Sequence, residues 1–278
     1  MKLKKMTAFL AVVFILAAAI LPAAASDENG VKVYVGNTIF EAGKTKIVNG
    51  LTYVPLRAVC ERMGDCDVMW DPETCTATVR TDGLVITAKN KDEYICANGR
   101  YLFSASPNYI DSDNRLYVPI RPLAKAFGAE VTWDGDECAA IVGAPTGPIE
   151  SGDTFYNKDD VYWLSHIIYS ESGIEPFIGQ IAVGNVVLNR MKLPGYPQTI
   201  YGIIFDNRFG VQFAPTATGT IWLDPSEESV IAAKVCLEGF SLSKDIIFFL
   251  DPVVATNLWM VYNCTYVMSI GTHAFYTY

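Results

Sequence analysis

The sequence contains very little of what a metal-dependent enzyme needs. Its two histidines, His166 and His273, lie far apart in the chain. None of the seven cysteines has the Cys-x-x-Cys spacing of a zinc site, and no His-Glu-x-x-His motif is present. Zinc hydrolases hold their metal through such closely spaced ligands, so these absences argue against a zinc amidase or metallopeptidase. We therefore expect neither a metal ion nor another cofactor.

Positive charge is also scarce. The chain has 21 lysines and arginines against 30 acidic residues, a net charge of −9. Without the three lysines of its N-terminal leader, the net charge becomes −12. Binding to nucleic acid requires clustered Lys and Arg, so we predict no nucleic-acid partner. An anionic polymer would have to be recognised through hydrogen bonds and stacking, for which 15 Tyr and 5 Trp are available.

Beyond the first 25 residues, no segment is long and apolar enough to cross a bilayer. At the N-terminus, three lysines precede an apolar run over residues 8–24, and small alanines stand before Ser26. This pattern predicts a secretory signal peptide over residues 1–25, and hence an exported protein without stable membrane insertion after cleavage. The alternative is a retained membrane anchor, because the run is close to spanning length.

The number of cysteines is odd. They are Cys60, Cys66, Cys75, Cys96, Cys138, Cys236 and Cys264. In an oxidising exterior some would form disulfides, and at least one would stay free or pair with another chain. An anaerobic setting or a spore interior would leave all of them as thiols.

A segment rich in proline and glycine divides the chain. Residues 143–152 contain two prolines and three glycines, which is incompatible with a helix or a central strand. We predict a linker over residues 144–152 between domains at 31–143 and 153–278. Each domain is long enough to form its own core.

The N-terminal domain contains an internal repeat. The segment Thr52–Arg57 (TYVPLR) matches Leu116–Arg121 (LYVPIR), 64 positions later, and a Trp-Asp pair follows in each copy, at Trp70 and Trp133. Proline at the first turn and glycine after the last turn punctuate a helix in each copy, over residues 56–63 and 120–127. The repeat predicts two strand–helix–strand units that share an α+β core.

With this paired motif, residues 31–143 resemble the copper amine oxidase N-terminal-like domain, a stalk module of bacterial wall proteins. Imidazole is the usual nitrogen ligand of copper, and both histidines lie outside this domain. The resemblance therefore implies a spacer or a module that binds wall or spore-coat partners. It does not imply a copper site.

The C-terminal domain opens with two predicted helices. Residues 157–169 carry an apolar stripe at helical spacing, and residues 177–191 are almost uncharged and apolar on most faces. The second helix should be buried, with Gly179 and Gly184 allowing close approach and Asn189-Arg190 at its end in a structural role. Glu171 lies between the helices, where partial burial would raise its pKa. The alternative is a surface or capping glutamate, although Glu175, directly before Pro176, is the better capping candidate.

The segment YSESGIEPFIGQIAVGNVVLNRM, residues 169–191, resembles the signature of SleB-type spore-cortex-lytic cell-wall hydrolases. The similarity continues through residues 197–200, 202–205, 212–213, 255–259 and 271–275, and so covers nearly all of residues 160–276. It implies a lysozyme-like mixed helical domain with a small antiparallel sheet, which cleaves peptidoglycan glycan strands of the spore cortex. The family's catalytic glutamate falls on Glu171, as general acid and base. Ser170 and Ser172 stand where the family commonly has alanine.

A single acid permits two reactions. In a lytic transglycosylase, the C6 hydroxyl of muramic acid attacks its own anomeric carbon and no enzyme nucleophile is needed. A muramidase needs a second carboxylate or a held water. Asp206, Asp224 and Asp251 are available, and the sequence selects none of them. A further alternative is a non-catalytic wall or spore-coat protein that keeps the fold.

The rest of the domain is predicted to hold a helix from Asp224 to Gly239 and strands at 245–250, 264–269 and 273–276. Five residues are candidates for substrate binding, although each could instead be core or surface: Tyr169, Gln212, Phe213, Trp259 and Tyr262. We expect His273 to be a hydrogen-bonded histidine on an edge strand. A Cys264/His273 peptidase is disfavoured because such enzymes place the cysteine at a helix start.

Overall fold

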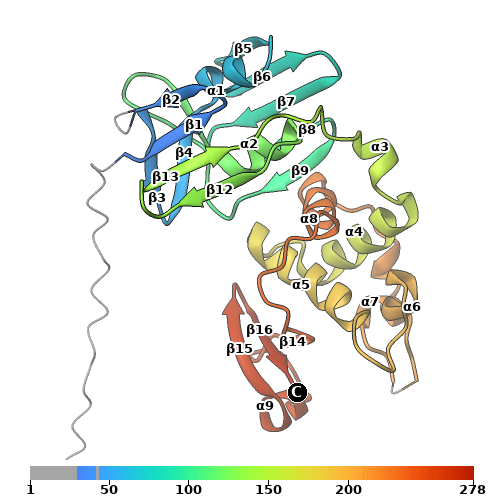
Figure 1. The fold of residues 1–278 in the computed structure, drawn as a ribbon. Helices are drawn as coiled ribbons and strands as arrows, with labels where there is room; N and C mark the ends of the chain where they lie inside the picture. Colours follow the sequence, from blue (N-terminus) through green and yellow to red (C-terminus); the bar gives the residue numbers. More distant parts are fainter. Residues whose placement is uncertain (1–29, 42–43, 209) are drawn as a thin grey trace, which may run out of the picture.

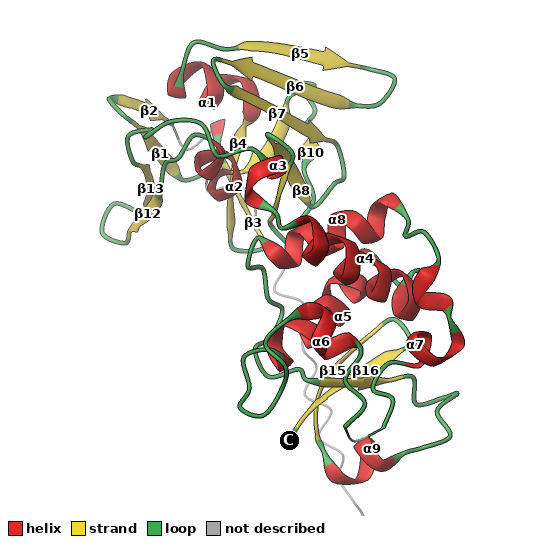
Figure 2. Ribbon diagram, turned by 90° about the vertical axis from the view of Figure 1, so that its right-hand side faces the viewer, coloured by secondary structure: helices red, strands yellow, loops and turns green. Residues whose placement is uncertain are grey.

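The computed structural model describes residues 30–41, 44–208 and 210–278. The predicted signal peptide at 1–25 lies outside these residues. A sheet-rich N-terminal domain stands on a mainly helical C-terminal domain, and a small sheet lies at the far end of the latter (Figures 1 and 2). The predicted α+β class is confirmed. No helix within the described residues is long and apolar enough to cross a membrane.

The N-terminal domain contains three sheets and two short helices. Its sheets have the strand orders β12-β13-β1-β2, β10-β11-β4-β3 and β5-β6-β7-β8-β9. The strands are β1 (Lys32–Val35), β2 (Thr38–Phe40), β3 (Lys46–Val48), β4 (Leu51–Pro55), β5 (Asp67–Asp71), β6 (Thr76–Thr81), β7 (Leu84–Lys89), β8 (Tyr94–Ala97), β9 (Arg100–Phe103), β10 (Tyr109–Ile110), β11 (Leu116–Pro119), β12 (Val131–Asp134) and β13 (Ala139–Val142). The helices are α1 (Leu56–Met63) and α2 (Ile120–Ala126).

The two copies of the repeat are related by an approximate two-fold axis. Strands β4 and β11 pair antiparallel, and Val54 faces Val118, which is its own counterpart in the other copy. Tyr53 likewise faces Pro119, and Pro55 faces Tyr117. Each strand leads directly into its helix, and each helix into a hairpin, β5–β6 or β12–β13. The two copies therefore share one core, as the repeat predicts.

The segment over residues 144–152 is fixed to the N-terminal domain. The amide of Ile149 donates to the carbonyl of Ala126 at 2.9 Å, and Asn98 Nδ2 donates to the carbonyl of Ile149 at 3.0 Å. The amide of Gly152 donates to the carbonyl of Asn98 at 2.8 Å. The prolines and glycines thus keep this segment out of regular helices and strands. The hydrogen bonds above still attach its described backbone to the N-terminal domain.

The C-terminal domain packs α4, α5 and α8 together and adds a three-stranded sheet. Its elements are α3 (Gly152–Phe155), α4 (Lys158–Ser172), α5 (Phe177–Arg190), α6 (Ile200–Ile204), α7 (Ala214–Thr218), the 3-10 helix η2 (Thr220–Trp222), α8 (Glu227–Leu237), β14 (Phe248–Leu250), α9 (Trp259–Asn263), β15 (Thr265–Ile270) and β16 (His273–Thr277). Asn157 caps α4, and its side chain accepts from the amides of Asp159 and Asp160. Ser226 caps α8 by accepting from the amide of Ser229.

The central helix of the domain is α5, which is buried along most of its length, as predicted. A Cβ on Gly184 would lie 2.7 Å from the Sγ of Cys236 on α8 and 2.9 Å from Ile168 Cδ1 on α4. Glycine at this position therefore sets how closely the three helices approach. The buried amide of Asn189 donates to the carbonyls of Ser243 and Ile246, which holds the chain that enters the sheet.

The small sheet corrects one prediction. Its strand order is β14-β16-β15, so His273 on β16 lies on the central strand and not on an edge. Burial lowers the pKa of His273, and its Nδ1 has no hydrogen-bond partner among the described residues. The expectation of a hydrogen-bonded edge histidine is therefore wrong on both points. All seven cysteines are free thiols.

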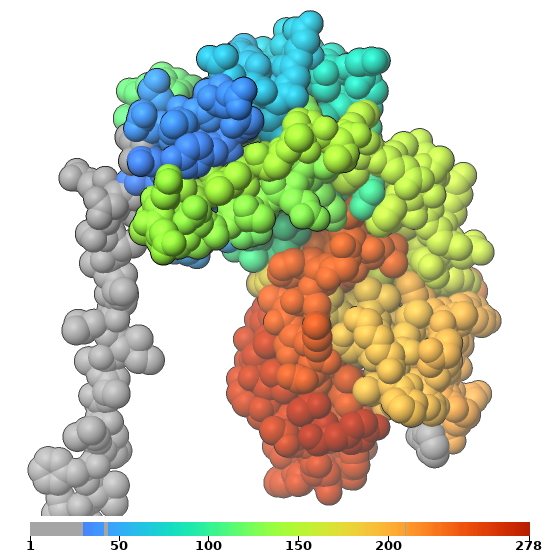
Figure 3. Space-filling model, in the orientation of Figure 1, coloured from blue at the N-terminus to red at the C-terminus, as the bar shows by residue number. Residues whose placement is uncertain are grey.

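A buried ion pair joins the two domains. Glu238, just after α8, accepts two hydrogen bonds from Arg100 on β9 at 2.6 and 2.7 Å. Lys125 Nζ and the Tyr156 hydroxyl also donate to this carboxylate, at 3.0 and 2.8 Å. The rings of Phe103 and Phe240 pack beside it with centroids 4.5 Å apart. Figure 3 shows the two domains in direct contact along this boundary.

Candidate active site

Glu171 lies in the last turn of α4, which continues beyond the predicted end at residue 169 as far as Ser172. The hydroxyl of Ser170 donates to the carbonyls of His166 and Thr220, and that of Ser172 donates to the carbonyl of Ile168. Both serines are thus bonded to main-chain carbonyls. Neither serine hydroxyl bonds to the Glu171 carboxyl, so serine in place of the family's alanine adds no hydrogen bond to this acid.

The side chain of Glu171 is partly buried. Burial raises its pKa to about 7, and the positive charge of Arg190 opposes part of this rise. Among the described residues, the Glu171 side chain has no hydrogen-bond or ion-pair partner within bonding distance. A carboxylic acid in this state keeps its proton near neutral pH and has a free oxygen to present to a ligand.

Arg190, the last residue of α5, is buried next to this acid. Its Nε donates to the carbonyl of Ile247 at 2.7 Å, and its Nη1 has no partner among the described residues. Its guanidinium lies 5.1 Å from the ring centroid of Phe213 and 5.3 Å from that of Phe248. Burial lowers the pKa of Arg190, and Glu171 is among the groups that oppose this. The sequence interpretation gave Arg190 a structural role only, whereas the structure adds an electrostatic one.

Two tyrosines and one aspartate also act on Arg190. The hydroxyls of Tyr196 and Tyr278 lie 2.9 Å apart, and burial raises the pKa of Tyr196 to about 12. Asp206 forms two hydrogen bonds with Arg208, at 2.8 and 2.7 Å, and these lower its pKa. Asp206 raises the pKa of Arg190 through its negative charge, whereas Tyr196, with a pKa of about 12, can do so only at high pH. No sequence pattern pointed to the tyrosine pair, because its members lie 82 positions apart in the chain.

Its effect on Arg190 distinguishes Asp206 from the other two candidate aspartates. Asp224 is exposed before α8. Asp251 accepts from the amide of Val253 in a turn after β14. Of the three, Asp206 alone acts on the charge of Arg190.

The five predicted substrate-binding residues are not all placed alike. Tyr169 lies against Gly173 at the end of α4, and Gln212 donates to the carbonyl of Gly210 at 3.0 Å. Phe213 is only 1% exposed and is part of the core beneath Arg190, so it does not present a face to a ligand. Trp259 and Tyr262, on α9, are 51% and 79% exposed.

Trp259 is linked to the buried site through one ring. Its indole lies edge-on to Phe248 at a centroid distance of 6.4 Å, and Phe248 flanks the guanidinium of Arg190. Tyr262 and Gln212 make no ring contact or hydrogen bond with Glu171 or Arg190 within the described part of the chain. The structure therefore brings Glu171, Arg190 and Phe213 together, and Phe248 connects Arg190 to Trp259.

The expected capping role of Glu175 is wrong. Helix α5 begins after Pro176 without a side-chain cap. The Glu175 carboxylate instead accepts from the amide and the hydroxyl of Thr272, at 3.0 and 2.7 Å. Gly271 next to it has φ +56°, and a Cβ there would overlap the carboxylate. Glu175 thus fixes the β15–β16 turn to the start of α5.

The residues present do not fit a copper ion. The described part of the N-terminal domain has no histidine, and no three His, Cys, Asp or Glu side chains gather as a metal site in the described ranges.

Two family models match the chain. The cell wall hydrolase model matches residues 174–276, beginning just after Glu171, and the copper amine oxidase N-terminal domain model matches residues 33–142. The spore cortex-lytic enzyme of Oceanobacillus iheyensis is 31% identical over 133 residues, which are 48% of this chain and 46% of that protein. That of Bacillus cereus is 32% identical over 120 residues, 43% of this chain and 45% of the relative. The chain therefore spans less than half the length of these relatives. Both resemblances inferred from the sequence are confirmed.

Among solved structures, the catalytic domain of the germination-specific lytic transglycosylase SleB from Bacillus anthracis is 30% identical, with a TM-score of 0.40. The similarity covers 46% of this chain and 100% of that one. The catalytic domain of the Bacillus cereus SleB protein is 31% identical, with a TM-score of 0.39. It covers 44% of this chain and 92% of that one.

Proposed function

The C-terminal domain of this chain belongs to the cell wall hydrolase family, and on that premise we propose that it cleaves the glycan strands of peptidoglycan. Glu171 is the general acid and base of this reaction. The relatives are spore cortex-lytic enzymes, so the proposed substrate is the spore cortex and the proposed location is outside the cytoplasmic membrane.

One observation carries the role of Glu171. Burial raises its pKa to about 7. At neutral pH a large fraction of this carboxyl is protonated, whereas an ordinary glutamate would be ionised. A general acid works best when its pKa lies near the operating pH.

The proposed reaction needs one side chain for proton transfer. Glu171 donates its proton to the glycosidic oxygen, and the bond between that oxygen and the anomeric carbon breaks. The resulting carboxylate accepts the proton of the muramic acid C6 hydroxyl, whose oxygen bonds to the same carbon. The products are a shortened strand with a new hydroxyl end and a 1,6-anhydro end, and Glu171 is protonated again.

We favour this lytic transglycosylase reaction over hydrolysis because Asp206, the candidate second group that acts on Arg190, is already engaged. Asp206 is held by two hydrogen bonds from Arg208, which satisfy both carboxylate oxygens. The buried guanidinium of Arg190 stabilises Glu171 in its ionised form after the first proton transfer.

The test is the release of muropeptides from purified spore cortex and vegetative wall. The wild-type chain should release soluble fragments with 1,6-anhydro ends, detected by mass spectrometry, and Glu171→Gln should release none. Reducing ends in place of anhydro ends would assign the protein as a muramidase. Wild-type-like release by Glu171→Gln would overturn the role of Glu171.

The control for this variant is its stability. The pKa of Glu171 is higher in the folded state than in the unfolded chain, so the wild type loses stability as pH rises from about 4.5 to about 7. Glutamine carries no charge and does not incur this loss. Glu171→Gln should therefore melt no lower than the wild type at neutral pH, and inactivity cannot then be ascribed to unfolding.

A further inference from the structure

Two surface grooves of the N-terminal domain are built from equivalent positions of the repeat. The first, a cavity of about 510 Å³, is lined by Pro119, Ile120, Arg121 and Trp133. The second, of about 240 Å³, is lined by their counterparts Pro55, Leu56, Arg57 and Trp70. The two-fold axis between Val54 and Val118 relates them. The folding of one repeat thus produces the same groove twice.

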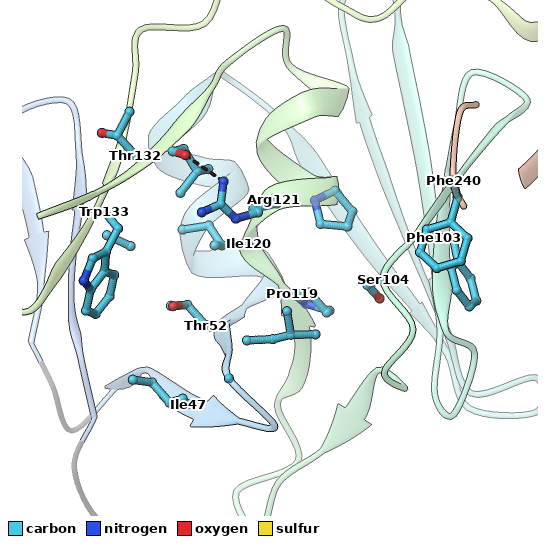
Figure 4. A pocket seen from close by; sticks show the side chains of 15 residues that line it. Ile47, Thr52, Phe103, Ser104, Pro119, Ile120, Arg121, Thr132, Trp133 and Phe240 are labelled. Atoms are coloured by element: carbon cyan, nitrogen blue, oxygen red, sulfur yellow. Dashed lines mark hydrogen bonds between the residues drawn. The ribbon is translucent and has the colours of Figure 1, made fainter. Parts of the chain in front are cut away.

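The arginines of the two grooves make one equivalent hydrogen bond each, and Arg57 in addition lies 4.0 Å from Glu61, which lines the second groove. Arg57 Nη2 donates to the carbonyl of Val68, and Arg121 Nη1 donates to the carbonyl of Val131, both at 2.9 Å. One donor of each guanidinium fixes its position, which leaves further donors for a ligand. Figure 4 shows Arg121 with this bond beside the open space of the first groove.

The tryptophan of each groove is exposed on a hairpin. Trp70 is 42% exposed and Trp133 is 49% exposed, and each faces an alanine across its hairpin, Ala77 and Ala140. Two large apolar rings kept at the surface of an acidic, exported domain stabilise the fold less than buried rings would. Such rings instead mark a binding surface.

The ligand chemistry follows from this pair. A flat indole stacks on the apolar face of a pyranose ring, and a guanidinium binds carboxylates and amide carbonyls. Arg121 is the sole charged residue among those described as lining the first groove, in a chain with 30 acidic residues. Peptidoglycan glycan offers both groups, since its pyranose rings carry N-acetyl carbonyls and lactyl groups, whose carboxyl is an amide where a peptide is attached and a carboxylate where none is. Two like grooves suit a polymer in which the same unit recurs.

We propose that the two grooves, defined by Trp70 with Arg57 and by Trp133 with Arg121, are two binding sites for peptidoglycan glycan strands. This inference rests on the proposed function of the C-terminal domain. Phe240 of that domain completes one end of the first groove, opposite Trp133 (Figure 4). A strand held there lies at the boundary with the catalytic domain, and the two sites together bind a long strand by multivalency.

The test uses the full chain with Glu171→Gln, so that the polymer is not consumed. Trp70→Ala and Trp133→Ala are made singly and together, and binding to insoluble peptidoglycan is measured by co-sedimentation. Each single substitution should weaken binding, and the double substitution should weaken it at least tenfold. In calorimetry with a tetramer of N-acetylglucosamine, each substitution should remove one binding site per chain.

Matched variants separate stacking from general surface effects. Trp70→Phe and Trp133→Phe keep a flat ring and should retain most binding, whereas Val85→Ala changes an exposed residue outside both grooves and should leave binding unchanged. Unaltered binding by the double alanine variant would overturn the proposal. So would a change of oligomeric state on sedimentation, which would show that the grooves contact another protein chain.

Failure of this proposal is distinguishable from failure of the proposed function. Cleavage is measured separately, with Glu171 intact, on short soluble glycan fragments that the catalytic domain can bind alone. Val85→Ala should cleave these fragments at the wild-type rate. Absence of cleavage by the wild-type chain would overturn the proposed function and would leave the co-sedimentation result standing.

Discussion

At the scale of single residues, the proposed chemistry depends on the balance between burial of Glu171 and the nearby charge of Arg190. Burial moves the pKa of Glu171 up to about 7, and Arg190 limits this rise. The guanidinium is itself buried and has an unsatisfied Nη1 among the described residues. A buried cation is costly unless it is paired, so its position here is strongly constrained by its bond to Ile247.

The pH dependence of cleavage should report this balance. Because the proposed reaction needs protonated Glu171, the rate should fall about tenfold per pH unit above pH 7. Arg190→Gln removes the charge that lowers the pKa of Glu171, so the midpoint of this fall should move to higher pH. The measurement is kcat/KM against pH on soluble fragments.

Two further variants make this prediction specific. Arg190→Lys keeps the charge and should leave the midpoint near that of the wild type. Arg80→Gln removes an exposed charge in the other domain and serves as the control. An Arg190→Gln profile that matches the wild type would show that the guanidinium does not act on Glu171.

At this scale, prediction from the sequence is limited because the environment of a side chain depends on residues that are distant in the sequence. Glu171 was identifiable because it stands between two helical patterns inside a family signature. Its neighbour Arg190 was visible as the end of an apolar helix, but its closeness to Glu171 depends on how α5 packs. Glu175 was misassigned because its partner, Thr272, is distant in the sequence, and a turn with Gly271 brings them together.

At the scale of elements, helices were easier to predict than sheets. The helix at 56–63 was predicted with its observed bounds, because proline and glycine mark its ends. The order of the small sheet was not predictable, since strand alternation does not say which strand lies in the middle. This is why His273 was assigned to an edge.

The close packing of α4, α5 and α8 can be tested at Gly184. Alanine would gain up to about 1 kcal/mol in helix propensity, but its Cβ would overlap Cys236 and Ile168, both buried. The overlap should dominate, with a net loss of about 1–3 kcal/mol in the free energy of unfolding, measured by chemical denaturation.

Gly179, on the same helix, is the matched control. A Cβ there would meet Glu175 Cβ at 3.3 Å and Ile270 Cγ2 at 3.4 Å, which requires only small adjustments. Gly179→Ala should therefore cost less than Gly184→Ala. Equal effects at the two positions would mean that the helix packing does not depend on Gly184.

At the scale of the whole molecule, the two domains are held together by Glu238. Burial opposes its ionised form, but the hydrogen bonds from Arg100, Lys125 and Tyr156 outweigh this and lower its pKa. The sequence predicted two domains and a linker but gave no sign of this contact, because its members come from β9, α2 and the residues directly after α3 and α8. A module read from the sequence as a spacer is thus firmly docked.

Glu238→Ala should separate the unfolding of the two domains. It leaves the guanidinium of Arg100 buried and unpaired, at a cost of about 3–5 kcal/mol. In calorimetry, the wild type should unfold in a single transition. The variant should show two transitions, and the first should have a lower melting temperature than that of the wild type. Because the pKa of Glu238 is lowered in the folded state, the wild type should lose this stabilisation as pH falls below about 4.5.

The exposed Glu227 at the start of α8 provides the control for this variant. Glu227→Ala should change the transition by no more than the effect of one helix-end charge, about 0.3–1 kcal/mol. If Glu238→Ala unfolded like Glu227→Ala, the ion pair would not be what couples the domains.

The facing of Val54 and Val118 has a consequence for how the N-terminal domain can diversify. In a symmetric homodimer, a strand can pair with the same strand of the other subunit, because one surface is complementary to itself. Strands β4 and β11 pair in this way. Here the two subunits of such a dimer are joined in one polypeptide. A true homodimer must change both sites at once, whereas this chain can alter one half alone. Thr132 in one half and Met69 in the other show that the halves already differ.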